Sequence, residues 1–541
     1  MGSQPSVLEQ HGFTMVREEG HATLVKSQEG NQYLVRQIHN SIEDVKEILK
    51  NLQHPHIIGH EKSFEDDGTF YVLVDYSEGG DLSKKIQAKR ECGEQFTEEE
   101  IKDWVVKVCM ALKHLHSKNI VHRDLRPQNI SLTEFGTVCL GELLEIKERA
   151  GVESDSTGEL YNIAPEILTG DAYHDKSDIW SLGCLLYELC MMKSAFSGES
   201  AVNLVPKILS GSYAPLPKTF SSSLCRLLSD LLQTDPERRP SAQEVLARPF
   251  IIAYLTAQSE RTVAELQESL QKLRALADGL ENVHFGTTVG SLTGGVIGAA
   301  GGITSIVGLI LAPFTLGASL IVTGVGVGIA VAGGATAGVS NITNMVNQST
   351  DRYNVKNVIR EFQEKMNSVV VSLQHICEGL EALNLSAENG NGPGTGTTGD
   401  MAKAGVRIGR GLGGIPELMR LAQVANIGKV AAQTARAVRA VEVATGIFSA
   451  FFLAVDVFFI AMDAKEIHDI RQTWAEASTP ESPVQLKVLD AEDSEIVEEG
   501  KPEVKSETMK FVLQIRETAT QLEEILDELN DIITFLPKVE A

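Results

Sequence analysis

Charged residues are absent from one long apolar stretch, Phe285 to Thr350, and the pattern there predicts helices that can cross a membrane. A helix of about 20 apolar residues spans the hydrocarbon core of a bilayer. Segments 287–311 and 315–338 reach that length on either side of Pro313, so 285–350 is predicted to be an apolar helical hairpin. The core of a soluble helical bundle would accept the same hairpin. Glycine favours the membrane, because each glycine costs a helix in water about 1 kcal/mol.

Small residues recur every fourth position in both halves of this hairpin, so they form a smooth face on each helix. Such faces allow two helix backbones to approach closely within a membrane. We therefore expect the two halves to pack on these faces. The glycines concerned are Gly290, Gly294, Gly298 and Gly302 in the first half, with Gly326 and Gly334 in the second.

Apolar residues at intervals of three and four predict amphipathic helices on both sides of the hairpin, at 263–280 and at 359–383. A glycine-rich linker at 389–400 and an acidic spacer at 478–506 separate the later segments. The last helix, 508–537, carries two regular apolar heptad rows. This pattern predicts a coiled coil with a partner or with a second copy of the chain.

Basic residues gather at 401–439, ahead of a second apolar segment at 443–462. A basic amphipathic stretch is typical of a surface that binds anionic lipid, although a solvated helix face has the same composition. The apolar segment is long enough to span a bilayer and is interrupted by Asp456. An acid within a membrane must be protonated, paired or facing water, which makes Asp456 a candidate pH switch. In a soluble bundle it would be paired or exposed.

The first half of the chain has a different pattern, in which short strand-like runs at 23–26, 32–38 and 69–75 precede helical segments. This order predicts a two-lobed α+β domain. The expected divisions are a tail at 1–12, an N-lobe at 13–76 and a C-lobe at 77–254.

The stretch “IVHRDLRPQNISL” contains HRDxxxxN, the catalytic-loop motif of protein kinases, with Asp124 and Asn129 at its two functional positions. The stretches “IAPEIL”, “SDIWSLGC” and “DPERRPSAQEVLARPF” follow in the order that kinases have. Together with “NLQHPHII” and “LVDYSEGGDL”, they make the first half resemble the NIMA-related (NEK) serine/threonine kinases.

The NEK resemblance implies a kinase fold and the roles of several residues. Asp124 would be the catalytic base, and Asp75 and Tyr76 would belong to the nucleotide site. The resemblance also implies that Glu166 and Arg239 form an ion pair, which would serve stability rather than chemistry.

Several positions depart from what catalysis requires. The segment that should be glycine-rich reads “VREEGHATLVK”, with two glutamates beside Gly20 that would repel a triphosphate. Arg36 replaces the phosphate-holding lysine, and Leu34 adds methylenes where a kinase has an alanine against adenine. The helix glutamate that should pair with that lysine falls on Val45, and the metal-binding aspartate of DFG falls on Glu142.

These departures predict a pseudokinase that binds ATP weakly or not at all. Asp124 and Asn129 would then remain as structural residues of the loop. The alternative is a weakly active, membrane-anchored serine/threonine kinase, in which Asn129 and Glu142 would hold Mg²⁺ while Leu34 and Arg36 line the ATP site. We therefore expect no cofactor, or ATP and Mg²⁺ under the alternative.

The second half, 261–475, combines an amphipathic helix, the hairpin “FGTTVGSLTGGVIGAAGGITSIVGLILAPFTLGASLIVTGVG” and a second helical arm, and a heptad helix follows it. It resembles the apolipoprotein L family. The resemblance implies an all-α domain that binds lipid and inserts into membranes, in some members as an ion-conducting pore. Some members are secreted. The alternative is a soluble lipid-binding protein that never inserts.

The 541-residue chain has a formal net charge of −25 and seven cysteines. The acidic balance argues against nucleic acid as a partner, because phosphate neutralisation requires clustered Lys and Arg. The odd cysteine count and the lack of a signal-peptide pattern predict an intracellular, cytoplasmic and membrane-associated protein, with an unknown protein partner for its first half. The start of the chain fits MGxxx[ST], which makes Gly2 a candidate for myristoylation.

Overall fold

The computed structural model describes nine stretches of the chain. They are residues 7–19, 22–28, 31–38, 52–141, 161–198, 200–291, 337–389, 427–477 and 507–536. Gly2, Gly20, Val45, Glu142, the hairpin glycines after Gly290, and the acidic spacer lie outside them, as does the linker beyond Asn389. The chain divides into two units, of which unit 1 contains 1–258, 371–434 and 536–541, and unit 2 contains 259–370 and 435–535.

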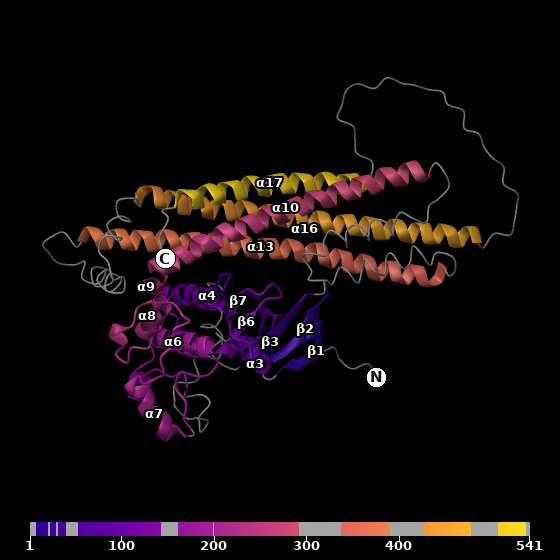
Figure 1. Ribbon diagram of the computed structural model, residues 1–541. Helices are drawn as coiled ribbons and strands as arrows, with labels where there is room; N and C mark the ends of the chain where they lie inside the picture. Colours follow the sequence, from indigo (N-terminus) through magenta and orange to yellow (C-terminus); the bar gives the residue numbers. More distant parts are fainter. Residues whose placement is uncertain are drawn as a thin grey trace. The chain divides into compact units, whose positions relative to one another are not determined.

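The N-lobe of unit 1 is a five-stranded antiparallel sheet in the order β1-β2-β3-β5-β4 (Figure 1). The three expected strands are present as β2 (Ala22–Ser27), β3 (Gln32–Ile38) and β5 (Thr69–Asp75). The sequence analysis missed β1 (Phe13–Glu19) and β4 (His60–Asp66). Both are edge strands rich in polar residues, which weakens the apolar alternation that signals a strand.

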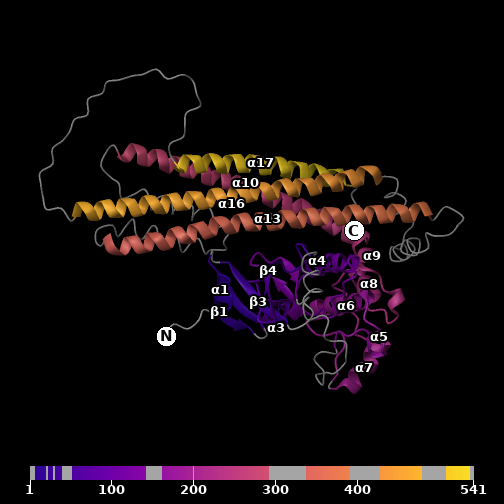
Figure 2. The same cartoon turned by 180° about the vertical axis from the view of Figure 1, so that it is seen from behind.

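The core of this sheet includes Val25, Val35 and Leu73, which are fully or almost fully buried. Val7 and Leu8 of the short helix α1 (Val7–Gln10) pack against that core, close to the labelled start of β1 in Figure 2. The stretch expected to be a tail therefore contains a packed helix.

The C-lobe is built around α4 (Glu98–Ser117) and α6 (Asp175–Met191), both largely buried. A capping box starts α4, because the Thr97 hydroxyl accepts from the Glu100 amide while the Glu100 carboxylate accepts from the Thr97 amide. The remaining elements are α3 (Leu82–Cys92), η1 (Pro127–Asn129), β6 (Ile130–Leu132), β7 (Val138–Leu140), α5 (Pro165–Leu168), α7 (Ala201–Ser210), α8 (Ser222–Leu231), η3 (Pro236–Arg238) and α9 (Ala242–Leu246).

A helix from the second half of the chain completes unit 1. The last part of α13 (Ala337–Asn389), from residue 371, belongs to this unit, as does the start of α10 (Pro249–Ser291). A Cβ built on Gly379 would lie 3.3 Å from Cα of Ala247 and 3.0 Å from Cδ1 of Ile252, so the backbones approach closely at this position. The compact unit that contains the kinase-like lobe therefore also includes segments that follow residue 254.

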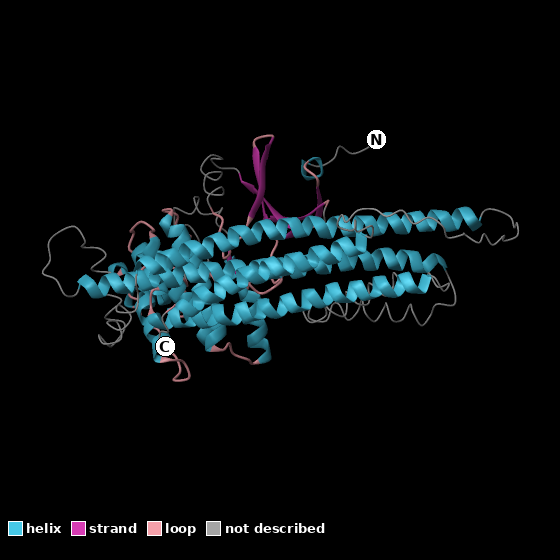
Figure 3. Ribbon diagram, turned by 90° about the horizontal axis from the view of Figure 1, so that it is seen from above, coloured by secondary structure: helices cyan, strands magenta, loops and turns pink. Residues whose placement is uncertain are grey.

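In the residues that the structure describes, unit 2 is made of helices, drawn in cyan in Figure 3. It comprises the later part of α10, the first part of α13, and most of α16 (Ile427–Ala477) and α17 (Glu507–Phe535). The apolar rows predicted at 263–280 and 359–383 are largely buried. The ends of the expected hairpin are helical, since α10 continues to Ser291 and α13 begins at Ala337.

Both heptad rows of α17 are buried within this chain. Ion pairs join α17 to α10, through Arg274 and Glu523 at 2.6 Å, and to α16, through Arg436 and Glu528 at 3.0 Å. Figure 1 shows α17 beside the same two helices. A coiled coil with another chain would therefore require this bundle to open. The buried heptad residues are Val512, Ile515, Ala519, Leu522, Leu526, Leu529 and Ile533.

Candidate active site and apolar helix face

The catalytic loop is held in place by one buried carboxylate of α6. Asp178 accepts hydrogen bonds from the backbone amides of His122 at 2.8 Å and Arg123 at 2.9 Å. It also accepts from the Tyr173 hydroxyl at 2.9 Å and pairs with Nε2 of His116 at 2.8 Å. Burial would raise the pKa of Asp178, but the hydrogen bond from His116 and the charges of His116 and His122 hold it below its ordinary value. The loop therefore keeps a rigid support.

Asp124, at the position of the catalytic base, makes contacts within the loop itself. Nδ2 of Asn129 donates to the backbone oxygen and to Oδ2 of Asp124, both at 2.9 Å. The Arg126 guanidinium lies 2.9 Å from the same Oδ2. The two predicted functional residues are thus brought together, and an arginine that the sequence analysis did not single out pairs with the carboxylate.

Strand β1 runs through the segment that should cover the phosphates of ATP. Its pairing with β2 is broken only by an irregularity between Met15 and Arg17 and continues to the pair of Glu19 with Ala22. A kinase has a glycine-rich sequence here, whereas this chain has glutamates, of which Glu18 is exposed. The two adjacent glutamates that the sequence places in this segment, Glu18 and Glu19, therefore lie at the end of strand β1.

The guanidinium of Arg17 reaches from β1 to the segment that joins the two lobes. It donates to the Tyr76 hydroxyl at 2.9 Å, and its carbon lies 6.0 Å from the centroid of the same ring. This contact ties β1 to Tyr76, a residue of the expected nucleotide site.

Leu34, Arg36 and Asp75 lie on the central strands, as the NEK resemblance implies. Leu34 is paired with Val74 of β5 across the sheet, and Arg36 with Val72. The amide of Asp75 donates to the Gly59 carbonyl at 3.0 Å, and a Cβ on Gly59 would lie 2.2 Å from Asp75 Oδ2. Val45 and Glu142, which complete the expected departures, lie outside the described residues.

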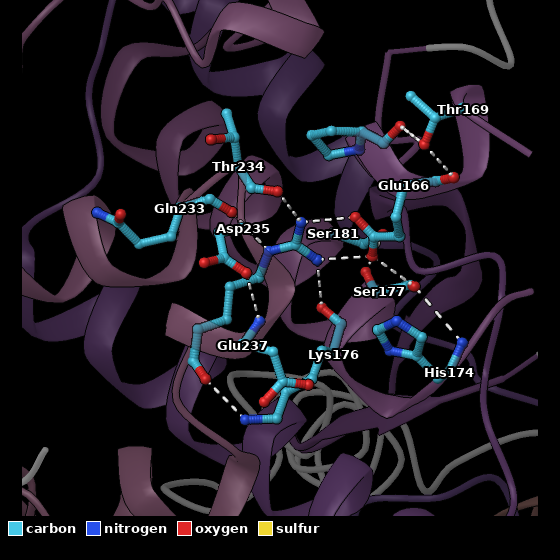
Figure 4. Close-up of polar contacts among 12 residues, drawn as sticks. Glu166, Thr169, His174, Lys176, Ser177, Ser181, Gln233, Thr234, Asp235 and Glu237 are labelled. Atoms are coloured by element: carbon cyan, nitrogen blue, oxygen red, sulfur yellow. Dashed lines mark hydrogen bonds and ion pairs between the residues drawn. The ribbon is translucent and has the colours of Figure 1, made fainter. Parts of the chain in front are cut away.

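Glu166 and Arg239 form the ion pair that the sequence analysis predicted (Figure 4). Both are buried, and two hydrogen bonds of 2.6 and 2.7 Å join the guanidinium to the carboxylate. Ser177 also donates to Glu166 at 2.7 Å, and the Gln233 carbonyl accepts from Nε of Arg239 at 2.7 Å. Burial would raise the pKa of Glu166, but the hydrogen bond from Arg239 lowers it below its ordinary value. This pair stabilises the lobe rather than acting in chemistry.

Asp456 of α16 is paired with a residue that the sequence analysis did not single out. Its Oδ1 lies 2.7 Å from Nζ of Lys356 on α13, and both side chains are partly exposed. Within the helical bundle the acid is therefore paired, as expected for a folded bundle. Lys356 could not be found from the sequence, since it is distant along the chain and belongs to another helix.

One face of α16 is apolar and exposed. Val443, Leu453 and Val457 are 58%, 64% and 51% exposed. The hydroxyls of Thr445 and Ser449 on the exposed surface donate to backbone carbonyls four residues earlier, each at 2.9 Å. Hydroxyls satisfied in this way tolerate an apolar environment.

The same region contains the one described helical segment, Ala435–Phe458, that is long and apolar enough to cross a membrane by length and composition. Of its apolar window, 28% is buried. It overlaps the expected second apolar segment, 443–462.

Comparisons with known proteins give a family for each half. Residues 16–251 match the protein kinase domain, and residues 254–478 match Apolipoprotein L. Serine/threonine-protein kinase Nek1 of Mus musculus is 42% identical over 245 residues, which are 43% of this chain and 20% of the relative.

Serine/threonine-protein kinase Nek4 of Mus musculus is 34% identical over 264 residues, 46% of this chain and 33% of the relative. Serine/threonine-protein kinase Nek3 of the same species is 35% identical over 239 residues, which are 42% of this chain and 46% of the relative. This chain thus spans less than half the length of each of these relatives. It consists of a protein kinase domain with relatives among the NEK kinases, followed by an apolipoprotein L domain.

Proposed function

We propose that this protein is an intracellular, membrane-associated pseudokinase scaffold whose apolipoprotein L domain binds anionic lipid and inserts into membranes. The exposed face of α16 carries this proposal. Val443, Leu453 and Val457 together offer apolar area that water does not favour, and an acyl-chain boundary would remove it from water. Insertion beyond this face, including a pore, would involve the uncharged hairpin 285–350.

Residues at the positions where a kinase binds nucleotide support the pseudokinase proposal. The segment that should cover the phosphates has Glu18 and Glu19 in place of a glycine-rich sequence, and Arg17 is engaged with Tyr76. Arg126 and Asn129 both contact Oδ2 of Asp124, which supports a structural role for this carboxylate within the loop. The kinase domain would then bind a protein partner, and no cofactor is needed.

Lipid binding is tested by flotation of the full chain with vesicles that contain anionic phospholipid. Leu453→Gln with Val457→Gln should lower the bound fraction about tenfold, because two exposed apolar side chains no longer leave water on binding. Val202→Gln with Leu209→Gln on α7 is the matched control, since these residues are also exposed apolar side chains at 81% and 41%. Equal binding of all three proteins would reject the α16 face. Carbonate extraction of the bound protein then separates insertion from the soluble lipid-binding alternative.

A weakly active kinase remains the second candidate, because the support of the catalytic loop by Asp178 is intact. The purified chain with ATP, Mg²⁺ and a generic protein substrate separates the two candidates. Phosphate transfer that is abolished by Asp124→Asn would establish the kinase and reject the pseudokinase.

A further inference from the structure

Four histidines gather where segment 371–383 of α13 packs within unit 1. His54 and His56 precede β4, His114 lies on α4, and His375 lies on α13. The ring centroid of His54 is 5.0 Å from that of His114 and 5.6 Å from that of His56. In the described part of the chain no group of three His, Cys, Asp or Glu side chains is arranged to hold a metal ion, so a metal does not explain this cluster.

The charged groups that face the histidines are mostly cationic. Nζ of Lys113 lies 3.3 Å from Nδ1 of His375 and pairs with Glu378, and Lys107 faces His56. His56 and His375 are buried, with 0% and 8% of their surface exposed. A proton on one of these rings would therefore place a positive charge beside Lys113 or Lys107, with Glu378 as the counter-charge.

His54, His56 and His375 stay neutral in the packed state. Burial, together with the neighbouring histidines and Lys113, lowers the pKa of His54 to about 2. Burial and Lys107 lower the pKa of His56 to about 3, and burial lowers that of His375 although Glu378 opposes the shift. Burial would raise the pKa of Glu378, but hydrogen bonds from His375 and Lys113 lower it to about 2, so its pair with Lys113 persists in mild acid.

The packing of the segment leaves little room for adjustment. Gly379 approaches Ala247 and Ile252 so closely that a side chain would displace the segment. Ser372, two helical turns earlier on the same face, is 7% exposed. The close packing at Gly379 and the contact of His375 with Lys113 therefore both belong to segment 371–383.

We propose that the kinase-like lobe holds segment 371–383 of the apolipoprotein L domain at neutral pH and releases it in mild acid, when His54 and His375 take up protons. The sign follows from linkage. A histidine that is neutral when packed and has a pKa near 6.5 when released favours release as pH falls below about 6.5. Each such histidine shifts the equilibrium towards release by about 30-fold between pH 7.5 and 5.0. This inference does not depend on lipid binding.

Release is measured in the full chain with a cysteine reporter, Ser372→Cys. The labelling rate of this thiol by a dithiopyridine is divided by that of the exposed Cys92 in the same molecule, which cancels the dependence of thiol reactivity on pH. Peptide mass spectrometry resolves the two sites. The ratio should rise at least tenfold from pH 7.5 to pH 5.0, and an unchanged ratio would overturn the proposal.

Three further variants of the reporter protein identify the cause. His54→Gln with His375→Gln should keep the ratio low at pH 5.0, whereas a rise equal to that of the unaltered reporter would overturn the role of the histidines. His60→Gln is the matched control, because burial also lowers the pKa of His60 while its neighbours are Glu61 and Lys62; it should behave as the unaltered reporter.

Gly379→Leu should give a high ratio at both pH values. It improves helix propensity, so a high ratio cannot come from a weaker helix. A low ratio at pH 7.5 would reject the geometric part of the inference. If the double histidine variant does not fold, Gly379→Leu still tests whether packing at this contact holds the segment.

Discussion

Lys356 of α13 and Asp456 of α16 meet at 2.7 Å, which places the acid of the second apolar segment in an ion pair inside the helical bundle. Both side chains retain partial exposure, so the pair contributes little to the stability of the bundle by itself. Its larger effect concerns insertion, because an ionised carboxylate at the centre of a membrane costs about 2.5 to 3.5 kcal/mol on insertion scales.

We predict that Asp456→Asn makes the protein permeabilise anionic vesicles at pH 7.5 about as well as the unaltered protein does at pH 5.0. The variant removes the charge at nearly constant shape. Release of a dye from the vesicles measures the effect. Lys356→Gln is the control, since it breaks the same pair but keeps the carboxylate. If Lys356→Gln has the same effect as Asp456→Asn, bundle opening rather than charge neutralisation limits activity.

Removal of one partner of the Glu166–Arg239 pair is predicted to destabilise unit 1 strongly. Glu166→Gln leaves the buried guanidinium without its counter-charge, which should lower the free energy of unfolding by about 3 to 5 kcal/mol. Urea denaturation followed by circular dichroism measures the change. Arg238→Gln next in sequence is the control, because the Arg238–Asp235 pair is exposed and should cost less than about 1 kcal/mol.

The same pair predicts a dependence of stability on pH. Since the pKa of Glu166 is lower in the folded state than in the unfolded chain, its contribution is fully present above the unfolded value of about 4.5. It decreases as pH falls through the folded pKa. The difference in unfolding free energy between the unaltered protein and Glu166→Gln should therefore be constant from pH 7 to 5 and shrink below about 4.5. A difference that grows in acid would contradict this account.

ATP with Mg²⁺ is predicted not to raise the melting temperature of the protein. Arg17 is engaged with Tyr76, and Arg36 stands where a kinase has lysine. Arg36→Lys alone should leave the melting temperature without a response to ATP, because Val45 and Glu142 still differ from the kinase pattern. A rise of several degrees in either protein, measured by differential scanning fluorimetry, would show that the site binds nucleotide.

Two glycines should respond in opposite ways to alanine. A Cβ on Gly79 would lie 2.4 Å from the Thr133 carbonyl oxygen and 2.7 Å from that of Leu132, so Gly79→Ala must displace backbone and destabilise unit 1. A Cβ on Gly446 of α16 meets nothing within 4 Å. Gly446→Ala should stabilise unit 2 by up to about 1 kcal/mol through helix propensity. Thermal melts of the two variants compare these effects, and a shift of the same sign in both would be inconsistent with them.

Local patterns accounted for much of the fold. The heptad spacing of α17 identified residues that are buried, and the NEK resemblance implied the pair of Glu166 with Arg239. Arg126 was not singled out, but it could have been identified from the sequence, because it stands two residues after Asp124 in the catalytic-loop motif. Edge strands β1 and β4 were missed because their polar residues carry no clear alternation.

Contacts between distant segments could not be read from the sequence. Lys113 and His375 are separated by 262 positions, and nothing in the pattern of either helix indicates that they meet. The pairing of Asp456 with Lys356 was equally hidden, since periodicity identifies the buried face of a helix but not the helix that covers it. Charge networks of this kind depend on tertiary packing.

The place of Gly379 against Ala247 and Ile252 has a consequence for how such a two-part gene can change. The two family matches meet near residue 254, and a recombination at that junction would leave the kinase-like lobe without the helix that covers these residues. The exposed apolar surface would favour aggregation of the shortened product. We therefore expect a product that ends near residue 254 to be less soluble than the full chain.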